Sequence, residues 1–385
     1  MRCLPAAPCC SAGACEPMRR ARRRGYRELL IVLGIFTFGH SIAAAFWAVY
    51  LSGDLGLSPA FIASLFAIGF FAAALGAMVF TVASSVPATP AMVAGIGCLA
   101  ATELALGLLE GPPLYLLFSV LFGASIPLFF LPWNVLLAAE THAADRGAKF
   151  GGINLAFALA NVGAPFVGGL VAASFGLRGL FLLSAIALAG SAAVTAAFAR
   201  RGERVRFGWN LREFRSGMTV AFLAQGGIEG ILSTAIPLTA FAFVQGKVEL
   251  GALFALFALT GGVFAFGLGR ISDRIQRRRR FIALGVAMSL PIVLAVGLAP
   301  TLPVFALANG ALVATLAIAP MFVIVIATDR MAGQMGPLMA TREVLLNLSR
   351  GVATVGVLLA YATGLPVQLA ILLVAILLPL ELLAS

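Results

Sequence analysis

Long apolar stretches, separated by short polar breaks, cover almost the whole chain. A helix needs about 20 apolar residues to cross the hydrocarbon core of a bilayer. The alternating polarity over about ten residues that is typical of membrane strands does not occur. Because backbone polar groups in lipid must bond within their own segment, the pattern predicts an all-α membrane protein. Twelve spans are expected near residues 29–51, 58–83, 90–109, 114–138, 149–174, 178–198, 216–244, 250–270, 281–299, 302–327, 339–362 and 366–383.

The composition agrees with a membrane as the main solvent. Hydrophobic residues make up 61% of the chain and charged residues 11%, with a mean hydropathy of +1.05. A soluble domain carries about 25% charged residues. No domain outside the membrane is expected, because the loops between the apolar stretches are short.

The positive net charge of +11 follows the expected topology of the chain. Only two of the 26 Lys and Arg residues, Arg178 and Lys247, fall on the side of the membrane opposite both termini. This is the positive-inside pattern, which predicts a multi-pass protein of the plasma membrane with both termini cytoplasmic. The placement argues against nucleic acid as a partner. The anionic inner leaflet is the expected partner of the basic segment Arg19–Arg27.

A basic, polar interval from Arg200 to Arg215 divides the twelve spans into six and six. The predicted organisation is a cytoplasmic tail (1–27), an N-terminal half (28–199), a cytoplasmic central loop (200–215) and a C-terminal half (216–385). Two six-helix pseudo-symmetric halves are a common transporter plan. The chain has no phosphate-binding Gly-x-x-x-x-Gly-Lys-Ser/Thr loop, so transport driven by its own nucleotide hydrolysis is excluded.

Four cysteines crowd the N-terminal tail at positions 3, 9, 10 and 15. A metal or redox role is disfavoured, because no second ligand cluster accompanies them and disulfides are rare in the cytoplasm. We expect no cofactor and no metal. Met18 precedes an arginine-rich run, as at the start of many membrane proteins, so residues 1–17 are expected to be disordered or untranslated.

The loop between the eighth and ninth spans reads Gly269-Arg-Ile-Ser-Asp273-Arg274-Ile-Gln-Arg277-Arg278. With the six-plus-six plan, it resembles the motif of the major facilitator superfamily (MFS) at this place. The resemblance implies the MFS fold and a cytoplasmic latch formed by Asp273, Arg274, Arg277 and Arg278. The motif departs from the family in having Gln276 for a glycine. The corresponding loop after the second span, 76–84, carries no charge.

The fifth span contains Gly163-Ala-Pro165-Phe-Val-Gly168-Gly169, which is similar to a motif of the family's proton-coupled exporters. Small residues allow helices to approach closely in lipid, and proline bends a helix. The alternative is ordinary small-residue packing, which is common in membrane bundles.

Few ionisable residues lie inside the expected spans, and such residues are candidates for function. Glu229 lies about 19 Å into the seventh span at 1.5 Å per residue, and His40 lies at a similar depth in the first. A carboxyl in a low dielectric can load and release a proton. Arg350 in the eleventh span shares a helical face with Asn347 and Glu343. Its side chain could snorkel toward the membrane surface or pair with Glu343. It could also pair with Glu229, and the Glu229–Arg350 pair would then be a structural or substrate-binding element.

The resemblance implies that spans 1, 4, 7 and 10 line a central cavity. The uncharged candidates for its wall are Gln225, Asn134, Asn309, Trp47 and Trp133. Aromatic residues near span ends are often interface anchors, an alternative for Trp47 and Tyr50. Glu103 in the third span is expected to lie near the outer surface and to be solvated.

These observations favour a secondary transporter that moves a small amphipathic molecule by alternating access, with protons as the coupling ion and export as the direction. An uptake permease for a sugar or organic acid is the alternative, and a membrane receptor or scaffold is another. A membrane-embedded lipid-modifying enzyme is disfavoured, because only Glu140, His142 and Asp145 form a polar cluster, on a cytoplasmic loop. We expect a monomer.

Overall fold

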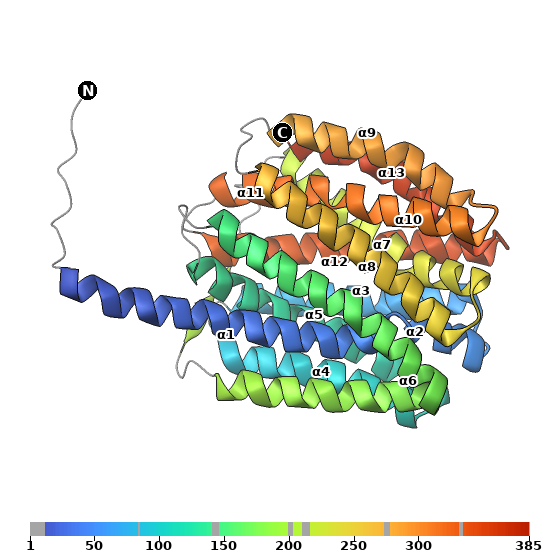
Figure 1. Ribbon diagram of the computed structural model, residues 1–385, viewed down its shortest axis with the longest axis horizontal. Helices are drawn as coiled ribbons and strands as arrows, with labels where there is room; N and C mark the ends of the chain where they lie inside the picture. Colours follow the sequence, from blue (N-terminus) through green and yellow to red (C-terminus); the bar gives the residue numbers. More distant parts are fainter. Residues whose placement is uncertain are drawn as a thin grey trace.

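The computed structural model describes residues 12–83, 85–140, 146–198, 203–209, 216–272, 278–330 and 334–384, most of them helical. Figure 1 shows long helices that lie side by side. The helices are α1 (Ala12–Ala44), α2 (Trp47–Val49), the π-helix η1 (Tyr50–Asp54), α3 (Pro59–Ala83), α4 (Ala88–Leu108), α5 (Gly111–Glu140), α6 (Arg146–Ala197), α7 (Ser216–Phe243), α8 (Lys247–Ser272), α9 (Arg278–Gly297), α10 (Leu302–Leu316), α11 (Ile318–Arg330), α12 (Met335–Ala362), α13 (Val374–Leu377) and the 3₁₀ segments η3 (Val367–Leu373) and η4 (Leu378–Ala384).

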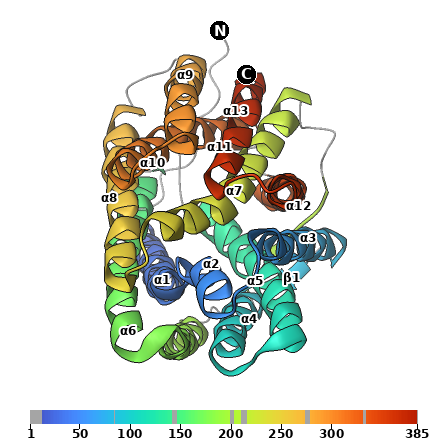
Figure 2. The ribbon, with the colours of Figure 1, turned by 90° about the vertical axis from the view of Figure 1, so that its right-hand side faces the viewer.

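Eleven segments of the described residues are long and apolar enough to cross a membrane. One of them lies in α6, which has 52 residues and would be about 78 Å long if straight, more than twice a hydrocarbon core. Gly176 breaks it with φ 77° and ψ 169°, a backbone conformation that glycine adopts readily, and the chain turns back there (Figure 2). The two arms correspond to the fifth and sixth expected spans, so the all-α membrane fold is confirmed.

The helices before and after the central loop form two neighbouring groups, α1–α6 and α7–α13 (Figure 2). The groups meet along two main seams, where α6 packs against α8 and α3 packs against α12. The division of the chain at 200–215 stays a prediction, because residues 199–202 and 210–215 lie outside the described part.

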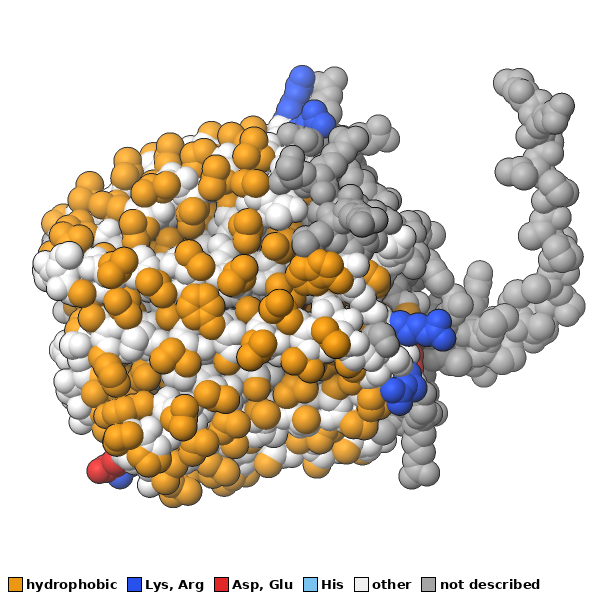
Figure 3. Space-filling model, turned by 180° about the vertical axis from the view of Figure 1, so that it is seen from behind, with side chains coloured by type: hydrophobic (Ala, Val, Ile, Leu, Met, Phe, Trp, Pro, Cys, Tyr) orange, Lys and Arg blue, Asp and Glu red, His pale blue; other side chains and the backbone are white. Residues whose placement is uncertain are grey.

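The face of the bundle in Figure 3 carries many hydrophobic side chains, and the charged side chains that are visible lie near its ends. Leu75, Ile186 and Leu307 are exposed by 64%, 68% and 76%. Side chains so exposed and so apolar suit contact with lipid, and exposed hydrophobic surface of this extent is not expected in water.

Three glycines of the seams leave no room for a side chain. A Cβ on Gly168 would collide with the carbonyl oxygen of Ile42, and one on Gly169 would lie 2.6 Å from the carbonyl oxygen of Lys247. Gly251 on α8 would meet the Pro165 carbonyl in the same way. The small residues of the fifth span therefore bring α6 against both α1 and α8.

A short two-stranded ribbon lies at one end of the bundle. β1 (Ser85–Pro87) pairs antiparallel with β2 (Arg204–Arg206). The Arg204 guanidinium donates to Ser85 Oγ at 3.0 Å and to the Ser85 carbonyl at 2.9 Å. Gly336 at the start of α12 packs directly on the Arg206 carbonyl. The ribbon therefore joins the loop after α3, the central loop and α12.

Several expectations concern residues for which the structure gives no side-chain description. Asp273, Arg274 and Arg277 lie outside the described residues, and Gly269 and Arg278 lie at the ends of α8 and α9 that border this gap. The latch therefore stays a prediction. Helix α1 begins at Ala12, so the expectation of a disordered segment is wrong for residues 12–17.

Candidate functional site

A cavity of about 590 Å³ lies between the two groups of helices. His40 and Ser41 of α1 and Asn161 of α6 supply polar groups from the first group, while Ala258 of α8 and Val313 of α10 supply apolar walls from the second. The volume falls in the range of about 300–1,000 Å³ that is usual for small-molecule sites. Spans 1 and 10 line the cavity as the resemblance implied. Its other walls come from spans 5 and 8, and none of the described lining residues comes from span 4 or 7.

The polar wall of the cavity is partly satisfied and partly open. Ser41 Oγ donates to Asn161 Oδ1 at 2.6 Å, and Asn161 Nδ2 donates to the Phe157 carbonyl at 2.9 Å. The buried Nδ1 atom of His40 has no hydrogen-bond partner among the described residues. His40 can therefore accept or donate a bond to a bound solute.

At the end that leads toward Lys247, α1, α6 and α8 pack closely against one another. Pro165 lines the cavity, and Gly168 and Gly169 follow it one turn further along α6. Their contacts with α1 and with the first turn of α8 bring the three backbones together beyond the cavity. A solute in the cavity would have to open this contact to leave by that end.

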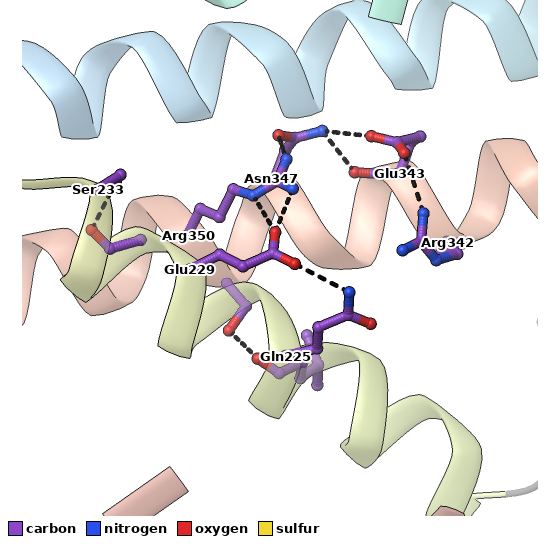
Figure 4. Close-up of polar contacts among 10 residues, drawn as sticks. Gln225, Glu229, Ser233, Arg342, Glu343, Asn347 and Arg350 are labelled. Carbon is purple, nitrogen blue, oxygen red and sulfur yellow. Dashed lines mark hydrogen bonds and ion pairs between the residues drawn. The ribbon is translucent and has the colours of Figure 1, made fainter. Parts of the chain in front are cut away.

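A second polar cluster joins α7 and α12 (Figure 4). The Arg350 guanidinium forms an ion pair with Glu229 Oε2, and Arg350 Nε donates to the same oxygen at 3.0 Å. Gln225 Nε2 donates to Glu229 Oε1 at 2.9 Å, and Arg350 Nη1 donates to Asn347 Oδ1 at 2.6 Å. Asn347 also donates to Glu343 Oε2 at 3.2 Å. Five of the residues that the sequence singled out are thus brought together.

The helix positions explain why this pair forms. A Cβ on Gly230 would lie 2.5 Å from the Arg350 carbonyl oxygen, so the two backbones touch next to the pair. The side chains remain partly accessible, Arg350 by 18% and Glu229 by 39%. The sequence predicted that a Glu229–Arg350 pair would be a structural or substrate-binding element. The reason is that a neighbouring guanidinium favours the charged form of a carboxyl.

The remaining candidates lie elsewhere. Asn309 on α10 is buried, with 1% of its surface exposed, and its Nδ2 atom has no partner among the described residues. Asn134 on α5 is half-buried and lies outside the cavity wall described above. Trp133 Nε1 donates to the Leu29 carbonyl at 3.3 Å, which makes it a packing residue between α5 and α1.

Glu103 corrects the expectation of a solvated acid near the outer surface. Its side chain on α4 is fully buried, with 0% of its surface exposed. Trp47 Nε1 donates to Glu103 Oε1 at 3.1 Å, so Trp47 is a buried residue and its assignment as an interface anchor is wrong. Tyr50 is also buried. The sequence does not show that the first and third spans are in contact, so it could not predict the burial of Glu103 and Trp47.

Among the described residues, no group of three or more His, Cys, Asp or Glu side chains is placed to hold a metal ion. Of the cluster expected around Glu140, His142 and Asp145 lie outside the described residues.

A helical membrane bundle with a cavity between two groups of helices is the plan of many membrane transporters. The sequence pattern of the Major Facilitator Superfamily matches residues 29–354, which is most of the chain, and the chain belongs to this family. Membership places it among membrane transporters. No curated protein matches the sequence significantly.

Solved structures show the same fold at low sequence identity. The human organic anion transporter MFSD10 (TETRAN) is 15% identical, with a TM-score of 0.67 over 94% of this chain and 99% of that one. A POT family transporter in complex with a thioalcohol-conjugated peptide is 12% identical, with a TM-score of 0.70 over 93% and 95%. An inward-facing bacterial homolog of the human lysosomal transporter Spinster is 15% identical, with a TM-score of 0.66 over 94% and 96%.

Proposed function

We propose that the protein is a secondary active transporter that exports a small amphipathic organic molecule across the plasma membrane in exchange for protons. The observation that carries the proposal is the cavity of about 590 Å³ whose walls come from both groups of helices. A site shared between two rigid groups can be exposed to each side in turn when the groups rock against one another.

The chemistry of the cavity supports an amphipathic substrate. Phe157, Phe254 and Val313 offer apolar contacts, and the polar groups are one imidazole, one hydroxyl and one amide. No carboxylate and no guanidinium is among the lining residues, so a multiply charged solute would lose its hydration without a partner. Two of the similar solved structures are an organic anion transporter and a transporter in complex with a conjugated peptide, so they do not select one substrate class for this chain.

Close packing at the Lys247 end supports an inward-facing state of this structure. Both termini and the basic loops are proposed to be cytoplasmic, so this end is the outer one. In this state the cavity would load its solute from the cytoplasm. We propose that the Glu229–Arg350 pair is a charged link between α7 and α12, and that another group loads the proton.

A flux screen in proteoliposomes tests the function. Mixtures of metabolites and drugs are offered with and without an imposed pH gradient, and at least one amphipathic solute is expected to accumulate only with the gradient. Ala258→Phe, which places a ring in the cavity, is expected to reduce this flux at least tenfold. Leu256→Phe is the matched control, because Leu256 lies on the same helix with 42% of its surface exposed.

Two results would overturn the proposal. One is that no solute responds to the gradient in the unchanged protein. The other is that the ring at position 258 leaves the flux equal to that of the control at position 256. Accumulation of a sugar or organic acid inside, with the gradient directed inward, would instead identify an uptake permease.

A further inference from the structure

Glu103 on α4 is a buried carboxyl that the proposed transport site does not use. None of its surface is exposed. Oε1 accepts the indole N–H of Trp47 at 3.1 Å, and Oε2 has no hydrogen-bond partner among the described residues. A buried oxygen without a partner is uncommon in a folded protein, so it calls for a physical reason.

Among the described residues, no cation forms an ion pair with this carboxyl. Arg178 of α6 is engaged by Glu110 and by the Tyr50 hydroxyl. Helix α5 follows α4 and begins at Gly111, and Glu140 is at its other end. The remaining titratable neighbour is His40 of α1, whose ring centroid is 5.2 Å from that of Trp47. Burial of an unpaired carboxylate is costly, whereas the neutral acid carries no charge to desolvate.

A neighbouring hydroxyl connects the carboxyl with α1. Ser184 of α6 lies beside the Glu103 carboxyl, and its Oγ donates to the Gly39 carbonyl at 2.7 Å. The hydroxyl therefore contacts both α1 and the carboxyl, and it is not the partner that Oε2 lacks.

Two routes connect Glu103 with the cavity wall. Trp47 holds Oε1 and lies against His40. Ser184 connects the carboxyl with Gly39, which precedes His40 and Ser41 on α1. Both His40 and Ser41 line the cavity. A change in the charge of Glu103 would therefore act on the helix that contacts the solute.

We propose that Glu103 is a proton-binding site that is occupied in this conformation and is linked to the cavity through Trp47, Ser184 and α1. The carboxylic O–H bond breaks when the rearranging helices admit water, the proton passes to that water, and the carboxylate remains. The proposal that Glu103 couples transport to protons rests on the proposed function. The proposal that Glu103 binds a proton rests only on the contacts of its side chain.

The emission of Trp47 provides a direct test, because this indole donates to the carboxyl. The chain contains three tryptophans, so Trp133→Phe with Trp209→Phe leaves Trp47 as the single emitter. The purified protein is titrated in lipid nanodiscs from about pH 4 to about pH 10, the range in which perturbed carboxyl groups ionise. We expect a single reversible transition of emission, and we expect Glu103→Gln to abolish it.

Matched variants separate the two titratable neighbours of Trp47. His40→Asn is expected to keep the transition, since Glu103 remains. Glu103→Met retains the side-chain length without a titratable group and replaces the Gln variant if that protein does not fold. The proposal is overturned if the unchanged emitter shows no transition, if a transition persists without Glu103, or if His40→Asn removes it.

The flux assay then tests the coupling separately. Glu103→Gln is expected to lose the effect of the pH gradient while it retains downhill exchange of the solute. Unchanged gradient-driven accumulation would overturn the coupling role. The emission titration needs no substrate, so a failure of the transport proposal would not be confused with a failure of the proton site.

Discussion

At the scale of single residues, the pair between Glu229 and Arg350 has consequences for stability. Each partner alone would leave a partly buried charge without its counterpart, and the other hydrogen bonds cannot replace it. We expect Glu229→Gln and Arg350→Gln each to lower the apparent melting temperature in detergent. The double variant should be less damaged than the sum of the two, with a coupling free energy of about 1 kcal/mol or more.

Transport distinguishes the role of this pair from that of a proton carrier. If the pair is a structural or substrate-binding element, both single variants reduce flux to a similar degree at every pH. Selective loss of gradient-driven accumulation in Glu229→Gln, with exchange retained, would instead make Glu229 the coupling group. Ser233→Ala, one turn along α7, is the control for changes in that helix.

Single-residue environments were the least predictable part of the site. The sequence identified Glu229, Arg350 and Asn347 as candidates because charged and polar groups are rare in the spans. It could not select the pairing of the first two, which are 121 positions apart. Glu103 was misplaced for a related reason: depth along a span says nothing about which neighbouring helix covers the side chain.

At the scale of elements, the seam between α1, α6 and α8 depends on Gly168. Gly168→Ala would drive a methyl group into the Ile42 carbonyl, and such overpacking costs about 1–3 kcal/mol. We expect a lower melting temperature and a weaker closure of the Lys247 end. Melting in detergent and solvent accessibility of cavity cysteines would measure the two effects.

Gly163→Ala is the matched control for this seam. It lies on the same helix, and a Cβ there meets nothing within 4 Å. Since Ala is a better helix former than Gly by about 0.5–1 kcal/mol, this variant should melt at the same temperature or higher. An equal loss of melting temperature in both variants would mean that close packing at the seam does not require glycine at position 168.

The helices themselves were predictable because the bilayer imposes one length and one polarity on every span. The break in α6 at Gly176 agrees with the boundary expected between the fifth and sixth spans. The packing partners were not predictable, since nearly all faces are apolar and no stripe marks the side that meets another helix. The ribbon of β1 and β2 was missed, because three-residue strands in loops carry no periodic signal.

At the scale of the whole molecule, the asymmetry of basic residues predicts the orientation in the membrane. In a cysteine-free background, Trp209→Cys and Lys247→Cys should be labelled from opposite sides of intact cells. An impermeant maleimide should reach position 247 first, and position 209 only after the membrane is opened. Labelling of both positions from the same side would refute the orientation and the inward-facing assignment.

The class of the protein was accessible from sequence because composition, loop charges and the Gly269–Arg278 segment agree with one another. The substrate was not, since its cavity is formed by residues from helices far apart in the chain, most of them small or apolar. Ser41 and Asn161, which make the polar wall, carry no signal that separates them from other polar residues in spans.

The ribbon also bears on the order in which the chain is assembled. Its two strands are separated by more than a hundred residues, with Ser85 and Arg204 119 positions apart. β1 is therefore unpaired while four further spans are synthesised and inserted. Gly336 is added to the ribbon at a later stage of synthesis. Because chain segments emerge in order during synthesis, pairing of the strands would mark the moment when the first six spans are complete and offer a preformed edge on which the eleventh can dock.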